Sequence, residues 1–386
     1  MNCVIHTPKI CHTADGNARL VAEIDFGSDA KEIWLEVDGK YGKYLCDERA
    51  DAFLIALLPH AMRAGLDIEC KAPVSERLKY QLETYLIPSL VKYGRSLHAS
   101  TIIADTDSTP MHNAGGVGAG VSCGVDSLHI LKNQLDSAYK SLKLTHLTIN
   151  NVGAFADEGC NQYNWTVQRA MSLSVELGLE FVRTNSNLAE QLPIEFVRVH
   201  TYANVFAVYA LQKLWKVFFY GSPGLDFQQY FSLSDNDLND AAHYDLLSLD
   251  SFSTQNLKIY SEGGAKERYD KILELIDFEP ANNYLQVCVS DSGPNCGRCF
   301  KCVRTLLMLD ALGAVDKFNK VFDVAEYFIN RHWYLQQLYW SHLTHADQML
   351  ERVYGRLCPD ISLNDKILVY GRMVKSKFNS MLCNRG

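Results

Sequence analysis

The spacing of apolar residues predicts two kinds of organisation along this 386-residue chain. In roughly the first 110 residues, segments in which every second residue is apolar, typical of half-buried strands, are interspersed with segments of helical spacing. The predicted strands are 18–26, 32–37, 66–70 and 100–104, and the predicted helices are 51–64 and 74–90. The pair Asp38 and Gly39, with Gly42 close behind, predicts a hairpin turn after the second strand. These elements predict a small α+β domain over residues 1–110, with substrate selection or dimerisation as its hypothetical role.

From residue 111 onward, strands alternate with amphipathic helices. The predicted strands are 144–150, 180–184 and 217–220, and the predicted helices are a first one ending near 137, then 166–177 and 201–214. This alternation predicts an α/β domain over residues 111–286, built on a doubly wound parallel sheet. Ligands of such sheets bind beyond the carboxyl ends of the strands, so the ends of these strands are weak binding candidates, with ordinary strand-to-helix turns as the alternative. The candidates are Asn150, Thr184, Asn185, Asn187 and Gly221, in the edge segments 150–151, 184–187 and 221–226.

A glycine-rich stretch precedes the first of these helices. Residues 115–128 read GGVGAGVSCGVDSL, in which small residues lead through a Gly/Ser turn into a helical pattern. Glycine lets the backbone approach an anion closely, and a helix start presents unpaired N–H groups and the positive end of its dipole. The stretch therefore predicts a phosphate-binding loop, in which Ser122 and Ser127 add hydroxyl donors and Asp126 either holds a magnesium ion or orders the turn. A turn without a ligand is the alternative, and a Walker A loop is excluded because no Gly-Lys-Ser/Thr follows.

The order Ser-x-Gly-x-Asp-Ser in this loop resembles the PP-loop of the ATP pyrophosphatase superfamily, whose pattern is Ser-Gly-Gly-x-Asp-Ser. The matching residues are Ser122, Gly124, Asp126 and Ser127, and Cys123 stands where the family has glycine. The resemblance implies an adenine nucleotide α-hydrolase-like fold. It also implies that residues 122–127, Val125 included, bind ATP, that Mg²⁺ binds near Asp126, and that Asp126 and Ser127 are catalytic. Cys123 is interpreted as a tolerated small residue, with a functional thiol as the alternative.

A cluster of cations follows further along the chain. The segment 261–271, SEGGAKERYDK, places Lys266, Arg268 and Lys271 at the start of a predicted helix. Cations in that position could clamp a pyrophosphate leaving group. A solvated basic face is the more common role for such residues. Arg268 and Lys271 are therefore weak candidates for the nucleotide site.

Four cysteines form the spacing C-x7-C-x2-C-x2-C in the segment 287–313, which a helical run completes. They are Cys288, Cys296, Cys299 and Cys302. Zinc takes four soft ligands in a tetrahedron at about 2.3 Å, and a C-x2-C step on a tight turn places two thiolates on the same side. The spacing favours a structural Zn²⁺ site. An iron–sulfur cluster, which would accept similar ligands, and redox-active or simply buried cysteines are the alternatives.

A PP-loop followed about 160 residues later by the core C-G-x-C-x-x-C resembles the 7-cyano-7-deazaguanine synthases, the QueC family. The resemblance covers residues 115–313, and no segment matches the synthase's deazapurine pocket. It implies a divergent ATP-dependent C–N ligase that adenylates a carboxylate or carbonyl, releases pyrophosphate and passes the activated group to ammonia or an amine. Two alternatives stay open. One is sulfur transfer, as in the tRNA thiolases, through Cys123 or Cys160; the other is a nucleotide-binding interaction module without catalysis.

Composition bounds the partners of the chain. A net charge of −8 and an isoelectric point near 5.8 disfavour bulk binding of nucleic acid. No stretch approaches the roughly 20 apolar residues of a membrane span, and the first residues lack the apolar run of a signal peptide. The 12 cysteines are therefore interpreted as cytosolic thiols or metal ligands. We expect a cytoplasmic enzyme with a small-molecule, peptide or protein acceptor.

The last part of the chain, residues 314–386, is rich in Tyr and Trp at helical spacing. Aromatic side chains at this spacing are more often core or interface than a binding site. They predict a helical C-terminal region that covers the core and forms a homodimer contact.

Overall fold

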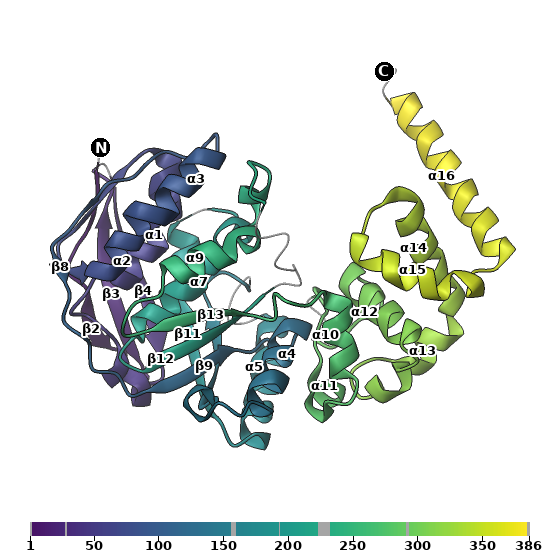
Figure 1. Cartoon of the computed structure of the whole chain (residues 1–386), viewed down its shortest axis with the longest axis horizontal. Helices are drawn as coiled ribbons and strands as arrows, with labels where there is room; N and C mark the ends of the chain where they lie inside the picture. Colours follow the sequence, from purple (N-terminus) through teal and green to yellow (C-terminus); the bar gives the residue numbers. More distant parts are fainter. Residues whose placement is uncertain are drawn as a thin grey trace. The chain divides into compact units, whose positions relative to one another are not determined.

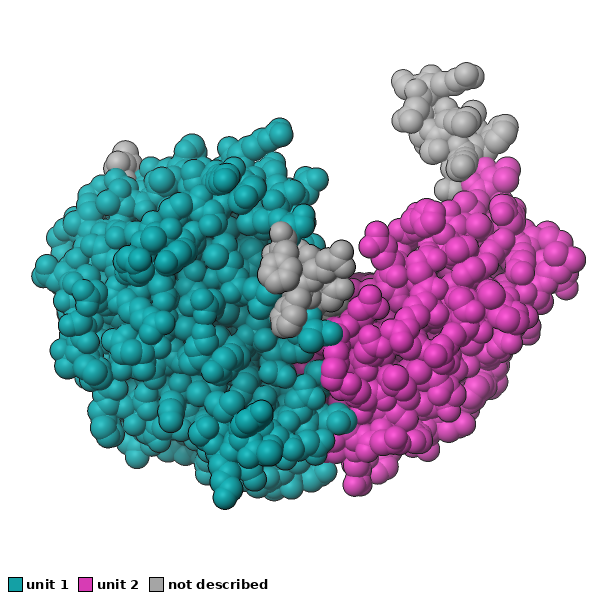
Figure 2. All heavy atoms as spheres, in the orientation of Figure 1, with its two compact units in different colours: residues 1–122, 129–265 teal, residues 123–128, 266–386 magenta. Residues whose placement is uncertain are grey.

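The computed structural model describes residues 2–27, 29–155, 160–192, 194–222, 232–290 and 293–383, the last few of these by backbone alone. By its internal contacts the chain divides into two compact units, coloured separately in Figure 2. Unit 1 comprises Met1–Ser122 and His129–Ala265, and unit 2 comprises Cys123–Leu128 and Lys266–Gly386. The predicted boundary near residue 110 has no counterpart in this division, and the predicted four-part organisation stays a prediction.

Unit 1 contains the alternating strands and helices. Five strands lie side by side in the order β13-β12-β9-β10-β11, and every neighbouring pair is parallel. They are β9 (Gly116–Gly120), β10 (His146–Asn151), β11 (Glu180–Ser186), β12 (Trp215–Gly221) and β13 (Lys258–Glu262). The chain adds β10 and β11 on one side of β9, then crosses back and adds β12 and β13 on the other. The strand order therefore reverses beside β9, as in doubly wound sheets. The predicted α/β class with a mostly parallel sheet is confirmed.

The helices between these strands cover both faces of the sheet. In Figure 1, α4 (Val125–Leu135) and α5 (Asn161–Glu176) lie on one side, and α7 (Phe196–Ala210) and α9 (Asp245–Ser251) on the other. Right-handed crossovers require this arrangement once the direction of strand addition reverses. The short helix α6 (Leu188–Gln191) follows β11.

The N-terminal strands extend the same sheet instead of forming a separate one. Strand β4 pairs antiparallel with β11, with Val37 opposite Thr184, and the order continues β4-β3-β1-β5-β7, with β2 pairing β3. Their bounds are β1 (Asn2–Ile5), β2 (Lys9–His12), β3 (Ala18–Asp25), β4 (Ala30–Val37), β5 (Asp67–Cys70) and β7 (Ile102–Ile103). A separate pair is formed by β6 (Val74–Ser75) and β8 (Thr106–Asp107). The parallel sheet predicted from the sequence is thus five strands of a mixed 11-stranded sheet.

The hairpin turn predicted at Asp38 and Gly39 is wrong. Strand β4 leads there into a 3-10 helix, η1 (Gly39–Tyr44), whose first turn Asp38 caps by accepting from the Lys40 amide at 3.0 Å. The β3–β4 hairpin turns earlier, beside Gly27, whose φ of +87° is in the region that glycine adopts readily. An Asp-Gly pair satisfies a helix cap as well as a hairpin, and the pattern alone does not distinguish them.

The predicted N-terminal helices are present. Helix α1 (Asp51–Ala64) ends at Gly65, which takes a left-handed φ of +68°, as expected of a glycine that stops a helix. The second is one continuous run made of α2 (Glu76–Gln81), a π-helical turn η2 (Leu82–Leu86) and α3 (Ile87–Tyr93). Helices α1 and α7 pack together through the rings of Phe53 and Phe206, whose centroids are 5.4 Å apart, in the core of unit 1.

Unit 2 is helical, as predicted for the C-terminal region. Its helices are α10 (Arg268–Leu275), α11 (Glu279–Tyr284), α12 (Phe300–Ala311), α13 (Val324–Ile329), α14 (Arg331–Thr344), α15 (Glu351–Leu357) and α16 (Leu363–Cys383). Short 3-10 turns occur in both units. Besides η1, those of unit 1 are Lys140–Leu142, Asp237–Asn239 and Ala241–Tyr244 (η5), and those of unit 2 are Val315–Phe318, Gln348–Leu350 and Cys358–Asp360. Within the described ranges, none of the helices combines the length and the apolar character that crossing a membrane requires.

Candidate functional site

The glycine-rich loop joins β9 to α4, as the sequence predicts. Val121 extends the pairing of β9 with β10 by donating its amide to the Thr148 carbonyl at 2.8 Å. Ser122 is exposed, and α4 begins at Val125. The Ser127 hydroxyl donates to the Gly124 carbonyl at 3.0 Å and so closes the first turn of the helix. In this conformation Ser127 stabilises the turn, and Ser122 is the hydroxyl of the loop that faces solvent.

Cys123 has an unusual backbone conformation. Its φ is +57°, in the left-handed region that costs a residue with a Cβ roughly 1–2 kcal/mol, and its side chain is fully buried. Its carbonyl accepts from the Gln286 amide at 2.8 Å. Glycine would adopt this φ without strain, which gives a physical reason for the glycine of the PP-loop pattern at this position. The burial of its side chain favours the interpretation of Cys123 as a small packing residue.

Asp126 brings two of the predicted cations together. Its carboxylate accepts from the Arg268 guanidinium at 2.6 Å and from the Lys271 ammonium at 3.0 Å. The Lys271 side chain is fully buried, and that of Arg268 is 15% exposed. Lys266, which precedes α10, instead pairs with Glu274 of that helix. A solvated basic face was the more common role expected for Arg268 and Lys271. That expectation is wrong, because both side chains turn toward the loop residue Asp126.

A third cation, Lys301, lies within electrostatic range of Asp126 and Arg268. Desolvation and repulsion from Arg268 and Arg304 lower the pKa of Lys301, while Asp126 acts in the opposite direction. Arg304 is itself paired with Asp347 at 2.6 Å. Arg268, Lys271 and Lys301 thus place three cationic side chains around the loop residue Asp126, and cations in such a group attract anions. Both oxygens of Asp126 already accept from cations. In this conformation Asp126 therefore orders the turn, the second of the two roles predicted for it, and does not present a free oxygen to Mg²⁺.

The weak candidates at the strand ends form two hydrogen-bonded pairs in unit 1. The Thr184 hydroxyl donates to Asn150 Oδ1 at 2.9 Å, and Asn151 Nδ2 donates to Asn185 Oδ1 at 2.9 Å. The carboxyl ends of β10 and β11 therefore lie together, as predicted. Asn187 instead accepts from the Trp34 amide and donates to the Glu32 carbonyl, both on β4. Gly221 pairs with Glu262 of β13 in the sheet. Residues 223–226 of the predicted edge lie outside the described residues.

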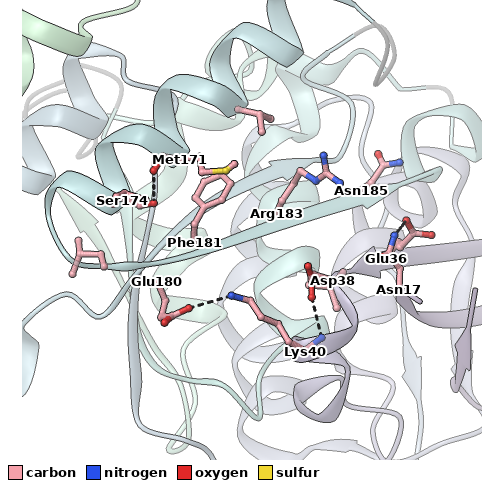
Figure 3. Close-up of a pocket in the computed structure, with 14 residues that line it drawn as sticks. Asn17, Glu36, Asp38, Lys40, Met171, Ser174, Glu180, Phe181, Arg183 and Asn185 are labelled. Carbon is pink, nitrogen blue, oxygen red and sulfur yellow. Dashed lines mark hydrogen bonds and ion pairs between the residues drawn. The ribbon is translucent and has the colours of Figure 1, made fainter. Parts of the chain in front are cut away.

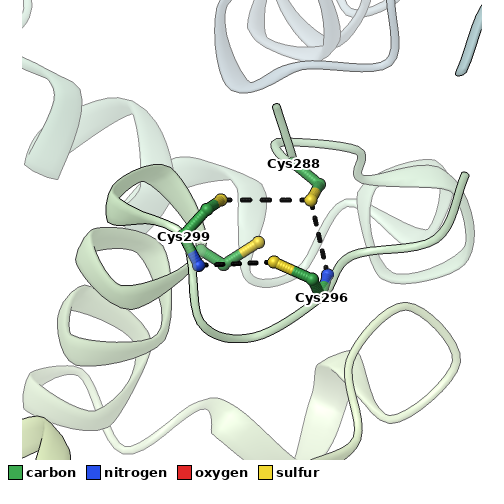
Figure 4. A group of neighbouring side chains, drawn as sticks. Cys288, Cys296 and Cys299 are labelled. Atoms are coloured by element: carbon green, nitrogen blue, oxygen red, sulfur yellow. Dashed lines mark hydrogen bonds between the residues drawn. The ribbon is translucent and has the colours of Figure 1, made fainter. Parts of the chain in front are cut away.

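The four cysteines of unit 2 converge on one point, which confirms that they could hold a metal ion (Figure 4). Their four Sγ atoms lie within 4.8 Å of one another. A zinc ion bound at about 2.3 Å to each of four thiolates places the sulfur atoms about 3.8 Å apart. The Cys299 and Cys288 Sγ atoms are 3.9 Å apart, close to that value. The donor set and its spacing therefore fit zinc.

Backbone amides support thiolates in this cluster. The Ser290 and Cys296 amides point at Cys288 Sγ from 3.4 and 3.5 Å, and the Cys299 amide points at Cys296 Sγ from 3.3 Å. Although burial raises the pKa of Cys288, hydrogen bonds from the Ser290 hydroxyl and from these amides lower it to about 6. Cys299 is also the residue immediately before α12, so the cluster fixes the start of that helix.

A pocket that the sequence did not indicate lies on unit 1 (Figure 3). It has a volume of about 510 Å³ and lies among α5, β11, the end of β4 and the start of η1. Apolar lining comes from Val167, Met171, Val175 and Phe181, and polar lining comes from both signs of charge. The sequence indicated Asp38 only for a turn and Asn185 only as a strand-end candidate, and the other lining residues are ordinary members of four separate elements.

Most charges of this pocket are already paired. The Lys40 ammonium lies 3.3 Å from Glu180, and Glu36 accepts from Arg19 at 2.7 Å. Arg183 is exposed, and within the described ranges its guanidinium makes no ion pair. The volume is in the range of small-molecule sites, but its chemistry does not single out a ligand.

Comparisons with models of known protein families, with curated proteins and with solved structures gave no match to this chain. Function is therefore argued from the residues and their geometry.

Proposed function

We propose that this chain is an ATP-dependent, AMP-forming ligase of the PP-loop type. The observation that carries the proposal is the ion-pair cluster at the loop, in which Asp126 is held by Arg268 and Lys271. The loop follows β9, beside which the strand order reverses, and this is where doubly wound sheets bind their ligands. An anion-binding helix start, a glycine-rich turn and paired cations are what a triphosphate requires.

Each residue of the loop has a part in this proposal. The amides at the start of α4 would bind phosphate oxygens, and the exposed Ser122 hydroxyl would donate to them. Arg268 would stabilise the charge that develops on pyrophosphate as the bond between the α- and β-phosphates breaks. The buried Lys271 would hold Asp126 and Arg268 in place. Mg²⁺, when bound with ATP, would neutralise charge on the phosphates.

The reaction we propose has two steps. A carboxylate or carbonyl oxygen of the substrate attacks the α-phosphorus, and pyrophosphate leaves. Ammonia or an amine then attacks the activated carbon and displaces AMP. Zinc in the cluster of Cys288, Cys296, Cys299 and Cys302 would be structural, since its four protein ligands leave no open position for a substrate.

The sulfur-transfer alternative requires a reactive thiol near the loop. Cys123 is fully buried, and Cys160 Sγ accepts from the Tyr163 amide at 3.3 Å as the cap of α5. These observations favour the ligase over the thiolase.

The test is product analysis. A panel of carboxylic acids, incubated with ATP, Mg²⁺ and ammonium, is screened for pyrophosphate and AMP. The expected result is acid-dependent formation of both, lowered about 10²-fold or more in Arg268→Gln. Arg352→Gln is the matched control. Arg352, on α15, is 47% exposed and pairs at 2.6 Å with Asp270, which lies on the same helix as Arg268. Formation of ADP and phosphate would contradict the proposal, and binding of ATP by calorimetry without any pyrophosphate would support the non-catalytic module instead.

A further inference from the structure

A second group of titratable side chains lies in unit 1, outside the loop. His200, on the first turns of α7, lies between a phenol and a carboxylate. Its Nδ1 is 2.9 Å from the Tyr220 hydroxyl, and its Nε2 is 3.1 Å from Asp240 Oδ1. The side chain of His200 is 20% exposed and that of Asp240 is 40% exposed, so the group is accessible at one end.

The hydrogen bonds determine which ring nitrogen carries the proton. Asp240 can only accept, because desolvation, which raises its pKa, is outweighed by hydrogen bonds from His200 and from the Ala242 amide. Nε2 must therefore carry the proton that it donates to Asp240. In the neutral ring Nδ1 is then an acceptor, and the only proton available to it from Tyr220 is the phenolic one. The phenol thus donates to a histidine whose tautomer a carboxylate fixes, the same logic as in Ser-His-Asp triads.

Local structure fixes the carboxylate of this group. Asp240 caps the 3-10 turn η5 by accepting from the Ala242 amide at 2.9 Å, which holds its side chain toward α7. A second neighbour, Thr201, lies 3.3 Å from His200 Nδ1, but its hydroxyl donates to Asp245 at 2.6 Å. Burial raises the pKa of Asp245 to about 7. The ring of Phe196 also lies near that of His200, and His243 lies near the Asp240 carboxylate.

The position of Tyr220 in the sheet connects it with the loop. Tyr220 is the last residue but one of β12. Its neighbour Phe219 pairs with Ala119 of β9, so Tyr220 is level with Gly120, from which the chain enters the glycine-rich loop. A phenol at this strand end is at the edge where the strand order reverses and where a ligand of the sheet would lie.

We propose that Tyr220 is a catalytic proton-transfer residue, with His200 and Asp240 as its positioning residues. Its assignment to the acceptor step rests on the proposed ligase function. As the amine nitrogen bonds to the activated carbon, its proton passes to the phenolic oxygen while the phenolic proton passes to His200 Nδ1. The carbon–oxygen bond to AMP then breaks with its electron pair on the phosphate oxygen, so the leaving group needs no proton. Asp240 stabilises the imidazolium until it releases the proton to solvent.

The first experiment needs no substrate. N-Acetylimidazole acylates phenols, and Tyr260 is a matched comparison because it lies on the adjacent strand β13 and is 39% exposed. We expect Tyr220 to be acetylated about 10²-fold faster than Tyr260, the low end of general-base assistance, and to lose that advantage in His200→Gln. The sites are located by peptide mass spectrometry. Equal rates at the two tyrosines, or an unchanged rate in His200→Gln, would overturn the proposal.

Nitrogen NMR of ¹⁵N-histidine-labelled protein tests the positioning roles. In the neutral ring of His200 we expect the proton on Nε2, and loss of that preference in Asp240→Ala, which removes the acceptor of the Nε2 proton. A neutral ring that carries its proton on Nδ1, or a tautomer preference unchanged in Asp240→Ala, would contradict the assignment.

With an acid that supports pyrophosphate release, Tyr220→Phe separates the two steps. ATP–pyrophosphate exchange reports the first step and should stay within about twofold, while transfer to ammonia falls about 10²–10⁴-fold. Tyr260→Phe should change neither. Equal loss of both steps, or of neither, in Tyr220→Phe would remove the proton-transfer role while leaving the ligase proposal intact. Absence of exchange in the unaltered protein would instead refute the ligase, with the acetylation result still deciding whether Tyr220 is activated.

Discussion

At the scale of single residues, Asp126 is the residue whose environment the sequence predicted least. The motif identified it as a loop residue with a ligand or turn role. Its partners Arg268 and Lys271 lie about 140 residues away, and nothing in local spacing indicates that they turn toward it. The burial of Lys271 has an energetic reason that a pattern of charges does not show, since a buried ammonium requires a nearby carboxylate.

Asp126→Ala should therefore destabilise unit 2 as well as affect activity. Removing this carboxylate from the fully buried Lys271 ammonium should lower the free energy of unfolding by about 3 kcal/mol. Asp126→Ala combined with Lys271→Met should lower it less than Asp126→Ala alone, because the double variant no longer buries that charge. Urea unfolding, with hydrogen exchange of the α10 and α12 amides, measures both effects.

A surface pair gives the control. Asp270, on the same helix as Lys271, pairs with Arg352 at 2.6 Å and is 34% exposed, so Asp270→Ala should cost at most about 1 kcal/mol. If Asp126→Ala costs no more than Asp270→Ala, the pairing of Asp126 with Lys271 does not stabilise the protein.

At the scale of elements, the cysteine cluster was the feature best predicted from sequence. Its spacing alone indicated convergence because a tight turn and a helix start leave little freedom to the side chains. The hairpin at Asp38 and Gly39 was wrong for the opposite reason, since one dipeptide suits two kinds of turn. The Tyr220–His200–Asp240 group had no signal at all, because its members come from β12, α7 and the cap of η5, each in an unremarkable local pattern.

We expect the purified protein to contain one zinc ion per chain. Cys296→Ser should lower the zinc content to near zero and should destabilise α12, because Cys299 of the same cluster immediately precedes that helix. Cys358→Ser is the matched control, since Cys358 is a partly exposed cysteine of the same unit that lies outside the cluster. Elemental analysis and hydrogen exchange of α12 check the prediction. An iron-rich or metal-free protein would contradict it.

At the scale of the whole molecule, the sequence predicted the layers of the parallel half correctly but not the continuity of the sheet. Alternating strand and helix patterns specify parallel neighbours, because each crossover helix returns the chain to the end of the sheet where the previous strand began. Nothing of this kind specifies that β4 pairs with β11, since the two strands are far apart in the chain and join antiparallel. The first 110 residues therefore looked like a domain of their own, whereas their strands are part of the sheet of unit 1.

Asn187 offers a test of that continuity. Its side chain accepts from the Trp34 amide at 2.9 Å and donates to the Glu32 carbonyl at 2.8 Å, so it joins the segment after β11 to β4. Asn187→Ala removes both hydrogen bonds and should lower the free energy of unfolding of unit 1 by about 2 kcal/mol. Because one sheet connects the two halves, hydrogen exchange of the β3 and β10 amides should accelerate together. Asn185→Ala, which removes one hydrogen bond within the parallel half, should cost about half as much. Faster exchange in β3 alone would show that the N-terminal strands unfold as an independent domain, contrary to the continuous sheet.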